Sequence, residues 1–152
     1  MNYRQQMDNI AVHIGTITKI YHEFAKLQGL TYNTMMVLEA LRQSQPCTQK
    51  QISEEWGLPK QSVNSVIKDF AKKEYIELLA GRNKKEKLIA FTEKGKTFAD
   101  STLQPSLAME ERVLQRIGEK ESRQFENTTA KFAQFFQEEF SAHQQSNSFS
   151  NI

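Results

Sequence analysis

The sequence predicts an α+β fold that is mostly α, in which a helix-turn-helix is followed by a short β hairpin. Apolar residues recur at helical spacing through most of the 152 residues, and the period becomes that of strands only over residues 75–91. Only three prolines and six glycines punctuate the chain, which favours long helices over a turn-rich sandwich. The length suits one compact domain with its own hydrophobic core.

Two helices open the chain. Residues 8–27 carry an isoleucine-rich stripe at steps of three and four, which predicts an amphipathic helix that Gly29 ends. Thr31 is then placed to cap a second helix over about residues 32–43. Its apolar residues point in nearly every direction, so we expect this helix to be buried until Pro46 breaks it.

A short helix over residues 49–56 and a longer one over residues 59–73 come next. Thr48 and Gln51 have the spacing of a capping box, in which each side chain bonds an unpaired backbone N–H at the helix start. Gly57 allows the left-handed backbone of a sharp turn. These features predict a helix-turn-helix.

The second helix of this pair has two unlike faces. At 100° per residue, its apolar side chains fall on one side and its amide, hydroxyl and ammonium groups on the other. The apolar side consists of Val63, Val66, Ile67 and Phe70, and the polar side consists of Gln61, Ser65, Lys68 and Lys72, with Asn64 at its edge.

A hairpin and two helices complete the chain. Strands over 75–80 and 87–91 enclose a basic loop, which is too long for a two-residue turn and should project. Thr92 is placed to cap a helix running to about Ile117, and Pro105 should kink this helix or end it near residue 103. A last helix covers about 119–141, and the polar residues 143–152 are predicted to form a disordered tail.

The charge is unevenly distributed. The net charge of the chain is +2, but residues 48–96 carry +4 and residues 97–152 carry −3. A basic middle segment is compatible with nucleic-acid binding. The lone cysteine, Cys47, excludes an internal disulfide framework. No apolar run approaches the ~20 residues of a membrane span, and the first nine residues lack a signal-peptide core, so we expect a soluble cytoplasmic protein.

A helix-turn-helix presents its second helix to the major groove of DNA, which is about 12 Å wide and admits one helix. A polar helix face is often merely solvated, but here the tight turn, the lysine-bearing helix and the basic hairpin follow one another. We therefore assign base readout to Gln61, Ser62, Asn64 and Ser65. Phosphate or wing contacts are assigned to Thr48, Lys60, Lys68, Lys72, Arg82, Asn83, Lys84, Lys85 and Lys87.

Residues 31–96 resemble the winged helix-turn-helix of the MarR family of bacterial transcription regulators. The resemblance rests on Leu30-Thr31, on TQKQISEEWGLPKQSVNSVIKDFAKKEYIELL at 48–79, and on Phe91-Thr92-Glu93-Lys94-Gly95. It implies a homodimer with interlocked first and last helices that binds a pseudo-palindromic operator. The family often responds to small phenolic or lipophilic ligands, oxidants or metals.

The sequence departs from the family pattern twice. The wing motif Asp-x-Arg appears as Asn83-Lys84-Lys85, and Lys85 lacks the planar fork of arginine. Glu74 stands where a glycine usually ends the recognition helix. If Glu74 adopts the left-handed conformation, the strain is about 1–2 kcal/mol.

The expected organisation follows the family layout. Residues 1–30 form an N-terminal dimerisation helix, residues 31–96 the winged helix-turn-helix, and residues 97–142 the C-terminal dimerisation helices. The last helix carries more aromatic area than a lone helix can bury, which favours a homodimer. The dimerisation residues are predicted to be Ile10, Ile14, Ile17, Phe125, Phe132, Phe136 and Phe140.

Other sites have weaker signals. His13, Tyr21 and Met36 are candidates for an effector pocket, although such residues are more often core or dimer contacts. No metal or cofactor is expected, and no catalytic set appears, so we expect a regulator, most simply a ligand-responsive repressor, and not an enzyme. Two alternatives stay open: a winged-helix module that binds protein, as an antirepressor does, and a redox regulator that uses Cys47.

Overall fold

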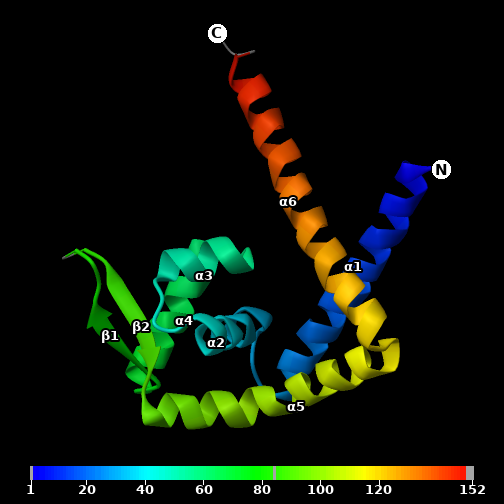
Figure 1. Cartoon of the computed structure of the whole chain (residues 1–152). Helices are drawn as coiled ribbons and strands as arrows, with labels where there is room; N and C mark the ends of the chain where they lie inside the picture. Colours follow the sequence, from blue (N-terminus) through cyan, green and yellow to red (C-terminus); the bar gives the residue numbers. More distant parts are fainter. Residues whose placement is uncertain (1, 84, 150–152) are drawn as a thin grey trace. The chain divides into compact units, whose positions relative to one another are not determined.

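The computed structural model of the chain describes residues 2–83 and 85–149. Six helices and two strands follow one another in this part of the chain (Figure 1). They are α1 (Tyr3–Leu27), α2 (Tyr32–Ser44), α3 (Gln49–Trp56), α4 (Lys60–Lys72), β1 (Ile76–Ala80), β2 (Lys87–Phe91), α5 (Glu93–Ile117) and α6 (Glu119–Phe149). The mostly helical α+β class is therefore confirmed.

The chain divides into two compact units, Met1–Ser106 and Leu107–Ile152. The two units differ in burial. Every buried side chain of the described residues belongs to the first unit, and none of those after Ser106 is buried. Without buried side chains the second unit has no core of its own.

The bounds of the early elements agree with the prediction, apart from the start of α1. This helix begins at Tyr3 and not near residue 8, because the Asn2 Oδ1 atom accepts a hydrogen bond from the Gln5 N–H at 3.1 Å and caps the helix. α5 passes through Pro105 without ending, so of the two predicted alternatives the helix end near Leu103 is wrong and the kink stays a prediction.

The predicted tail is partly helical. α6 continues to Phe149, so residues 143–149 extend the helix and do not form a disordered segment. No glycine or proline occurs after residue 118 to stop it. Residues 150–152, the remainder of that prediction, lie outside the described residues.

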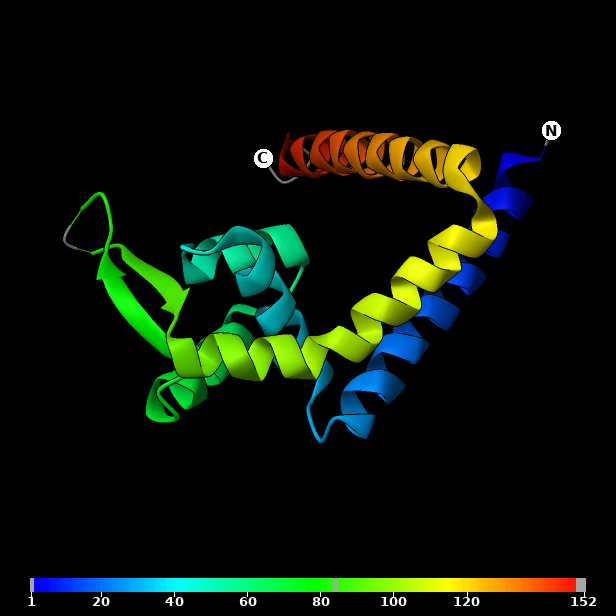
Figure 2. The same ribbon diagram turned by 60° about the horizontal axis from the view of Figure 1, so that its bottom comes forward.

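The core of the first unit lies among α2, α3, α4 and the base of the hairpin. α2 is buried on nearly all sides, as predicted, with Met35, Val37 and Leu38 at most 2% exposed. Ile52 of α3 and Phe70 of α4 are equally inaccessible. The β1–β2 hairpin projects from this bundle (Figures 1 and 2).

The helix starts and the sharp turn are built as the sequence predicts. The Thr31 hydroxyl accepts the Thr34 N–H at 3.1 Å. The Thr48 N–H donates to Gln51 Oε1 at 2.8 Å while the Gln51 N–H donates to the Thr48 hydroxyl, which completes the capping box. Gly57 has a φ of 61° and ends α3 in the left-handed conformation.

The end of α4 contains the one strained residue among those described. Glu74 adopts a φ of 61°. The Tyr75 N–H donates to the Phe70 carbonyl and the Glu74 N–H to the Ala71 carbonyl, the pattern of a Schellman motif, which usually places glycine at this position. The rings of Phe70 and Tyr75 meet edge to face at 5.9 Å, and this contact supports the turn.

The start of α5 is locked to that turn. The Thr92 hydroxyl donates to the Glu74 carbonyl at 2.7 Å and accepts the Gly95 N–H at 3.0 Å, so it also caps α5. A Cβ atom on Gly95 would lie 1.7 Å from the Tyr75 carbonyl oxygen, so this close approach requires glycine. Lys94 Nζ donates to the Lys73 carbonyl at 2.9 Å.

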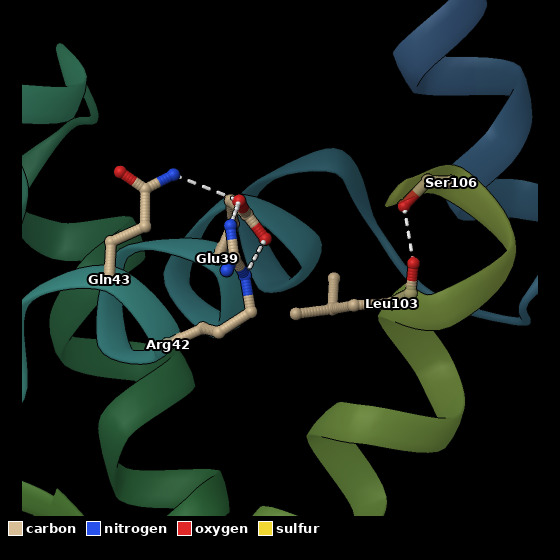
Figure 3. Close-up of polar contacts among 5 residues, drawn as sticks. All are labelled: Glu39, Arg42, Gln43, Leu103 and Ser106. Atoms are coloured by element: carbon tan, nitrogen blue, oxygen red, sulfur yellow. Dashed lines mark hydrogen bonds and ion pairs between the residues drawn. The ribbon is translucent and has the colours of Figure 1, made fainter. Parts of the chain in front are cut away.

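A polar cluster on α2 lies near the first half of α5 (Figure 3). Arg42 Nε and Gln43 Nε2 each donate to the Glu39 carboxylate at 2.9 Å. Leu103 of α5 points towards α2, and the buried Ser106 hydroxyl donates to the Leu103 carbonyl at 2.8 Å.

The environment of Glu39 shifts its pKa. Burial opposes ionisation of this carboxyl, but the hydrogen bonds from Arg42 and Gln43 and the charge of Arg42 outweigh burial, so the pKa of Glu39 lies below its ordinary value.

Candidate nucleic-acid interface

The two faces of α4 differ in burial as the sequence predicts. Val63, Ile67 and Phe70 are at most 3% exposed and fix the helix to the core. The opposite side is open to solvent. Exposed along α4 are Lys60, Gln61, Ser65, Lys68 and Lys72, while Ser62 and Asn64 are half-buried at the edges.

The turn before α4 is held by a buried hydrogen bond. The Ser53 hydroxyl donates to the Leu58 carbonyl at 2.6 Å, and the Leu58 N–H donates back to the Ser53 carbonyl at 3.1 Å. With Gly57 between them, these bonds fix the direction in which α4 leaves α3. The start of α4 therefore has a defined orientation, which a helix that enters a groove needs.

The hairpin is anchored at its base and free at its tip. β1 and β2 are antiparallel, with Ile76 opposite Phe91 and Ala80 opposite Lys87. Ile89 is fully buried and exchanges two backbone hydrogen bonds with Cys47, at 3.1 and 2.7 Å. This extra bridge, which the sequence analysis missed, joins the hairpin to the segment that precedes α3.

The tip of the hairpin carries most of the predicted wing residues. Arg82, Asn83, Lys85 and Lys87 are exposed. Lys84, which we also predicted to contact phosphate, lies outside the described residues. The predicted projecting basic loop is confirmed in shape, and its contacts with DNA stay a prediction.

A hollow of about 340 Å³ lies between the start of α3 and the hairpin. Three predicted phosphate contacts line it, Thr48, Lys85 and Lys87, together with Glu86. Two further lining residues, Gln49 and Lys50, were missed. Their place in the first turn after the capping threonine was a usable signal, because backbone N–H groups at a helix start favour anions.

Cys47 is 2% exposed, at the bridge between this segment and the hairpin. Burial raises the pKa of its thiol, and the negative charge of Glu55 raises it further. The thiolate is the form that oxidants attack, so this environment disfavours reaction. These features favour a structural role for Cys47 over a role as a redox sensor.

The three candidate effector residues differ in burial. Met36 is 7% exposed and belongs to the core, Tyr21 is half-buried, and His13 is exposed on α1. His22, which is not one of the three candidates, stacks on Tyr32 of α2 with ring centroids 4.2 Å apart. The effector pocket stays a prediction.

The predicted dimerisation residues are largely exposed. Ile10, Ile14 and Ile17 of α1 are 40–49% exposed. The second unit contains an open, mostly apolar cleft of about 890 Å³ between the end of α5 and α6, lined by residues that include Leu114 and Phe125. Of the aromatic side chains of α6, Phe132 is half-buried, and Phe125, Phe136 and Phe140 are 54–64% exposed.

Within residues 2–83 and 85–149, no three His, Cys, Asp or Glu side chains are grouped so that they could hold a metal ion. No helix in this described part of the chain is both long and apolar enough to cross a membrane.

Comparison with known proteins finds a family whose sequence model matches part of the chain. Residues 28–85 match the sequence model of the MarR family, and this range covers α2, α3, α4, β1 and most of the hairpin loop. No curated protein sequence matches the chain significantly.

Solved structures extend the similarity over nearly the whole chain. A MarR family regulator from Neisseria meningitidis is 28% identical, covers 94% of this chain and 99% of its own, and superposes with a TM-score of 0.79. Staphylococcus aureus MarR in complex with salicylate and kanamycin shares the fold at 16% identity, with coverages of 90% and 93% and a TM-score of 0.68. Streptococcus pneumoniae FabT in complex with DNA does so at 17% identity, with coverages of 90% and 99% and a TM-score of 0.65.

Proposed function

We propose that the chain is a winged helix-turn-helix transcriptional regulator of the MarR type and acts as a sequence-specific repressor, because residues 28–85 match the model of that family and a solved member shares the fold over nearly the whole chain. It binds a pseudo-palindromic operator in double-stranded DNA as a homodimer, and a small-molecule effector releases it. It acts in the cytoplasm, within reach of chromosomal DNA.

The exposed polar face of α4 over a buried apolar face is the observation that carries this proposal. Gln61, Asn64 and Ser65 offer amide and hydroxyl groups that can bond base edges in the major groove. Lys68 and Lys72 follow on the same exposed side and supply charge for phosphates. The related FabT was solved bound to DNA, which supports this use of the fold.

The hollow beside α3 supports a second phosphate contact. Three lysines, Lys50, Lys85 and Lys87, are among its lining residues, and so is Thr48. Neutralised phosphates release counterions, so each such contact should steepen the salt dependence of binding by about one unit. The hairpin then lies against the phosphate backbone of the DNA, while α4 contacts base edges in the major groove.

Exposed apolar side chains support the homodimer. Ile14 and Ile17 of α1 and Phe136 and Phe140 of α6 leave large apolar areas facing solvent. Patches of this kind mark interaction surfaces. A symmetric dimer would present two copies of α4 to half-sites separated by about one helical turn, ~10 base pairs.

The last part of the proposal concerns the effector. The Staphylococcus aureus relative was solved with salicylate, an aromatic acid. In this chain we assign the effector contact to His13, Tyr21 and Met36. Salicylate is therefore the first compound to test for release of DNA.

A mobility-shift assay with the DNA upstream of the chain's own gene tests the function. We expect a retarded fragment, a loss of affinity as salt is raised, and protection of two half-sites by footprinting. No retardation of any DNA fragment would contradict the proposal and would favour a module that binds protein.

Two substitutions on α4 separate its roles. Gln61→Ala should relax the preference at one base pair by about 1–3 kcal/mol, whereas Lys68→Ala should weaken all sequences alike and flatten the salt slope by about one unit. Lys131→Ala, an exposed lysine on α6, is the matched control. An unchanged salt slope in Lys68→Ala would show that this lysine does not contact phosphate.

A thiol switch is tested by Cys47→Ser. If peroxide releases the DNA from the wild type but not from this variant, Cys47 is part of the regulation. If both respond alike, or neither responds, Cys47 has only a structural role.

A further inference from the structure

The tip of the hairpin is a closed loop. The Gly81 N–H donates to the Glu86 carbonyl at 3.1 Å and continues the pairing of the strands by one step. The Glu86 N–H also reaches the Asn83 carbonyl, at 3.3 Å. Backbone bonds alone thus bring the two ends of the loop together, and side chains of the loop add further bonds.

The Asn83 side chain accepts two of these bonds. Its Oδ1 atom accepts the Lys85 N–H at 3.0 Å and the Glu86 N–H at 2.9 Å. A short polar side chain that bonds backbone groups two and three residues further on stabilises a turn. The position of the Lys85 backbone is therefore set by Asn83.

Glu86 supports the opposite side of the loop. Its Oε2 atom accepts the Arg82 N–H at 3.1 Å. A Cβ atom on Gly81 would lie 2.8 Å from the Cβ and Cγ atoms of Glu86, so glycine leaves the room in which the Glu86 side chain folds back. The backbone N–H groups of Arg82 and Lys85 are thus both held by side chains of the same loop, while the Arg82 and Lys85 side chains are exposed.

We propose that Asn83 and Glu86 are positioning residues that pre-form the wing tip for the DNA backbone, and that the neutral amide of Asn83 gives support without adding negative charge there. This inference rests on the proposed DNA-binding function. A loop that is already ordered loses less conformational entropy on binding, which strengthens association. A carboxylate at position 83 would accept the same two N–H groups but would repel phosphate.

The chemistry predicts effects of opposite sign for changes in charge at the two positions. Asn83→Asp keeps an acceptor and adds a negative charge, so it should weaken DNA binding at low salt. Glu86→Gln keeps an acceptor and removes a negative charge, so it should strengthen binding at low salt. Both differences should fade as salt is raised, because added ions screen exposed charges.

Removal of the acceptor should have a different signature. In Asn83→Ala the Lys85 N–H loses its side-chain acceptor and the Glu86 N–H keeps only the longer bond to the Asn83 carbonyl. The net value of a hydrogen bond predicts a loss of affinity of about 3- to 10-fold. This loss should persist at high salt, because it comes from loop order and not from charge. Amide hydrogen exchange at Lys85 and Glu86 should become faster in Asn83→Ala and stay slow in Asn83→Asp.

The experiment measures binding of the full chain to a fluorescent mixed-sequence DNA duplex over a series of salt concentrations. Asn127→Ala and Asn127→Asp are the matched controls, since Asn127 is an exposed asparagine on α6. Thermal unfolding of each variant confirms that the fold is kept. Neither control should change affinity or salt dependence by as much as the corresponding change at Asn83.

The outcomes separate this inference from the function on which it rests. If the wild type binds no DNA duplex, the proposed function fails and the inference falls with it. If the wild type binds and Asn83→Ala binds equally well, only the inference is overturned. The inference is also overturned if Asn83→Asp and Asn83→Ala lose affinity equally at every salt concentration, since support by the acceptor would then be irrelevant.

Discussion

In α4 the apolar residues Val63, Ile67 and Phe70 are at most 3% exposed, whereas Phe125, Phe136 and Phe140 of α6 are 54–64% exposed. Both helices are amphipathic in sequence. For α4 the complementary apolar surface comes from α2 and α3 of the same chain, while α6 has no buried residue among those described. An apolar stripe therefore predicts that one face of a helix will be buried. It does not indicate whether the same chain or another molecule covers that face.

The difference also assigns separate tasks to the two regions. Residues 48–96 carry the excess positive charge and contain the buried apolar face of α4 and the buried base of the hairpin. Residues 97–152 carry a net −3 and contain the exposed phenylalanines. The proposed DNA contacts and the aromatic part of the proposed dimer contacts thus fall on segments of opposite charge, so this part of the dimer surface is not drawn to phosphate.

The largest expected effect is in the core of the winged helix. Phe70→Ala should lower the free energy of unfolding by about 3–5 kcal/mol, because it empties a site that is 1% exposed. Chemical denaturation measures this loss, and it should not depend on protein concentration. A change below about 1 kcal/mol would mean that the core is not what supports α4.

The next largest effect is expected in the exposed aromatic side chains of α6. Phe136→Ala removes a side chain that is 64% exposed and stacks on Phe132 at 5.7 Å. In a two-fold dimer the substitution acts twice, so the free energy of association should fall by about 2–4 kcal/mol. Sedimentation over a range of concentrations measures it, with Lys131→Ala as the exposed control. A wild-type chain that stays monomeric at micromolar concentration would contradict the proposed homodimer.

A smaller effect is expected where α4 ends. Glu74→Gly should raise the free energy of unfolding by about 1 kcal/mol, since glycine tolerates the φ of 61° that strains glutamate. Chemical denaturation measures the change. Gly57→Ala is the matched control, because it places a side chain in the same left-handed conformation and should lower the free energy of unfolding. Destabilisation by Glu74→Gly would show that the glutamate side chain makes a contact worth more than the strain.

The smallest effect concerns pH. The pKa of Glu39 is lower in the folded chain than its ordinary value of 4.5, so its stabilising contribution is present at neutral pH and is lost as the pH falls below that value. Glu39→Gln should reduce this part of the acid destabilisation and leave the slope near neutral pH unchanged. Denaturation midpoints measured between neutral and acid pH test the sign. An unchanged acid slope in Glu39→Gln would assign the pH dependence to other carboxylates.

Local signals account for the elements that the sequence predicted well. Thr31, Thr48 and Gln51 act within three residues of one another, and Gly57 acts on its own backbone, so their effects are readable without the fold. The polar face of α4 was predictable for the same reason, because helical periodicity alone sets which residues share a side. Asn2 carried an equally local capping signal that was overlooked.

Other features depend on pairs of residues far apart in the chain. The bridge between Cys47 and Ile89 and the close approach of Gly95 to Tyr75 leave no local pattern in sequence. The hollow beside α3 exists only because that bridge holds the hairpin against the start of the helix. Gln49 and Lys50 were therefore missed, although each is a plain member of a predicted helix.

The sequence by itself determined the helix-turn-helix, the hairpin, the charge separation and the set of exposed groups on α4, because periodicity, capping and backbone preference act over a few residues. Only the tertiary structure decided that Glu74 accepts a left-handed backbone, that Cys47 is buried at a strand bridge, and that the apolar stripe of α4 is covered while that of α6 is not. Such outcomes depend on which distant surfaces meet, and the free energy of burying them exceeds the local preferences of about 1–2 kcal/mol that a sequence pattern reveals.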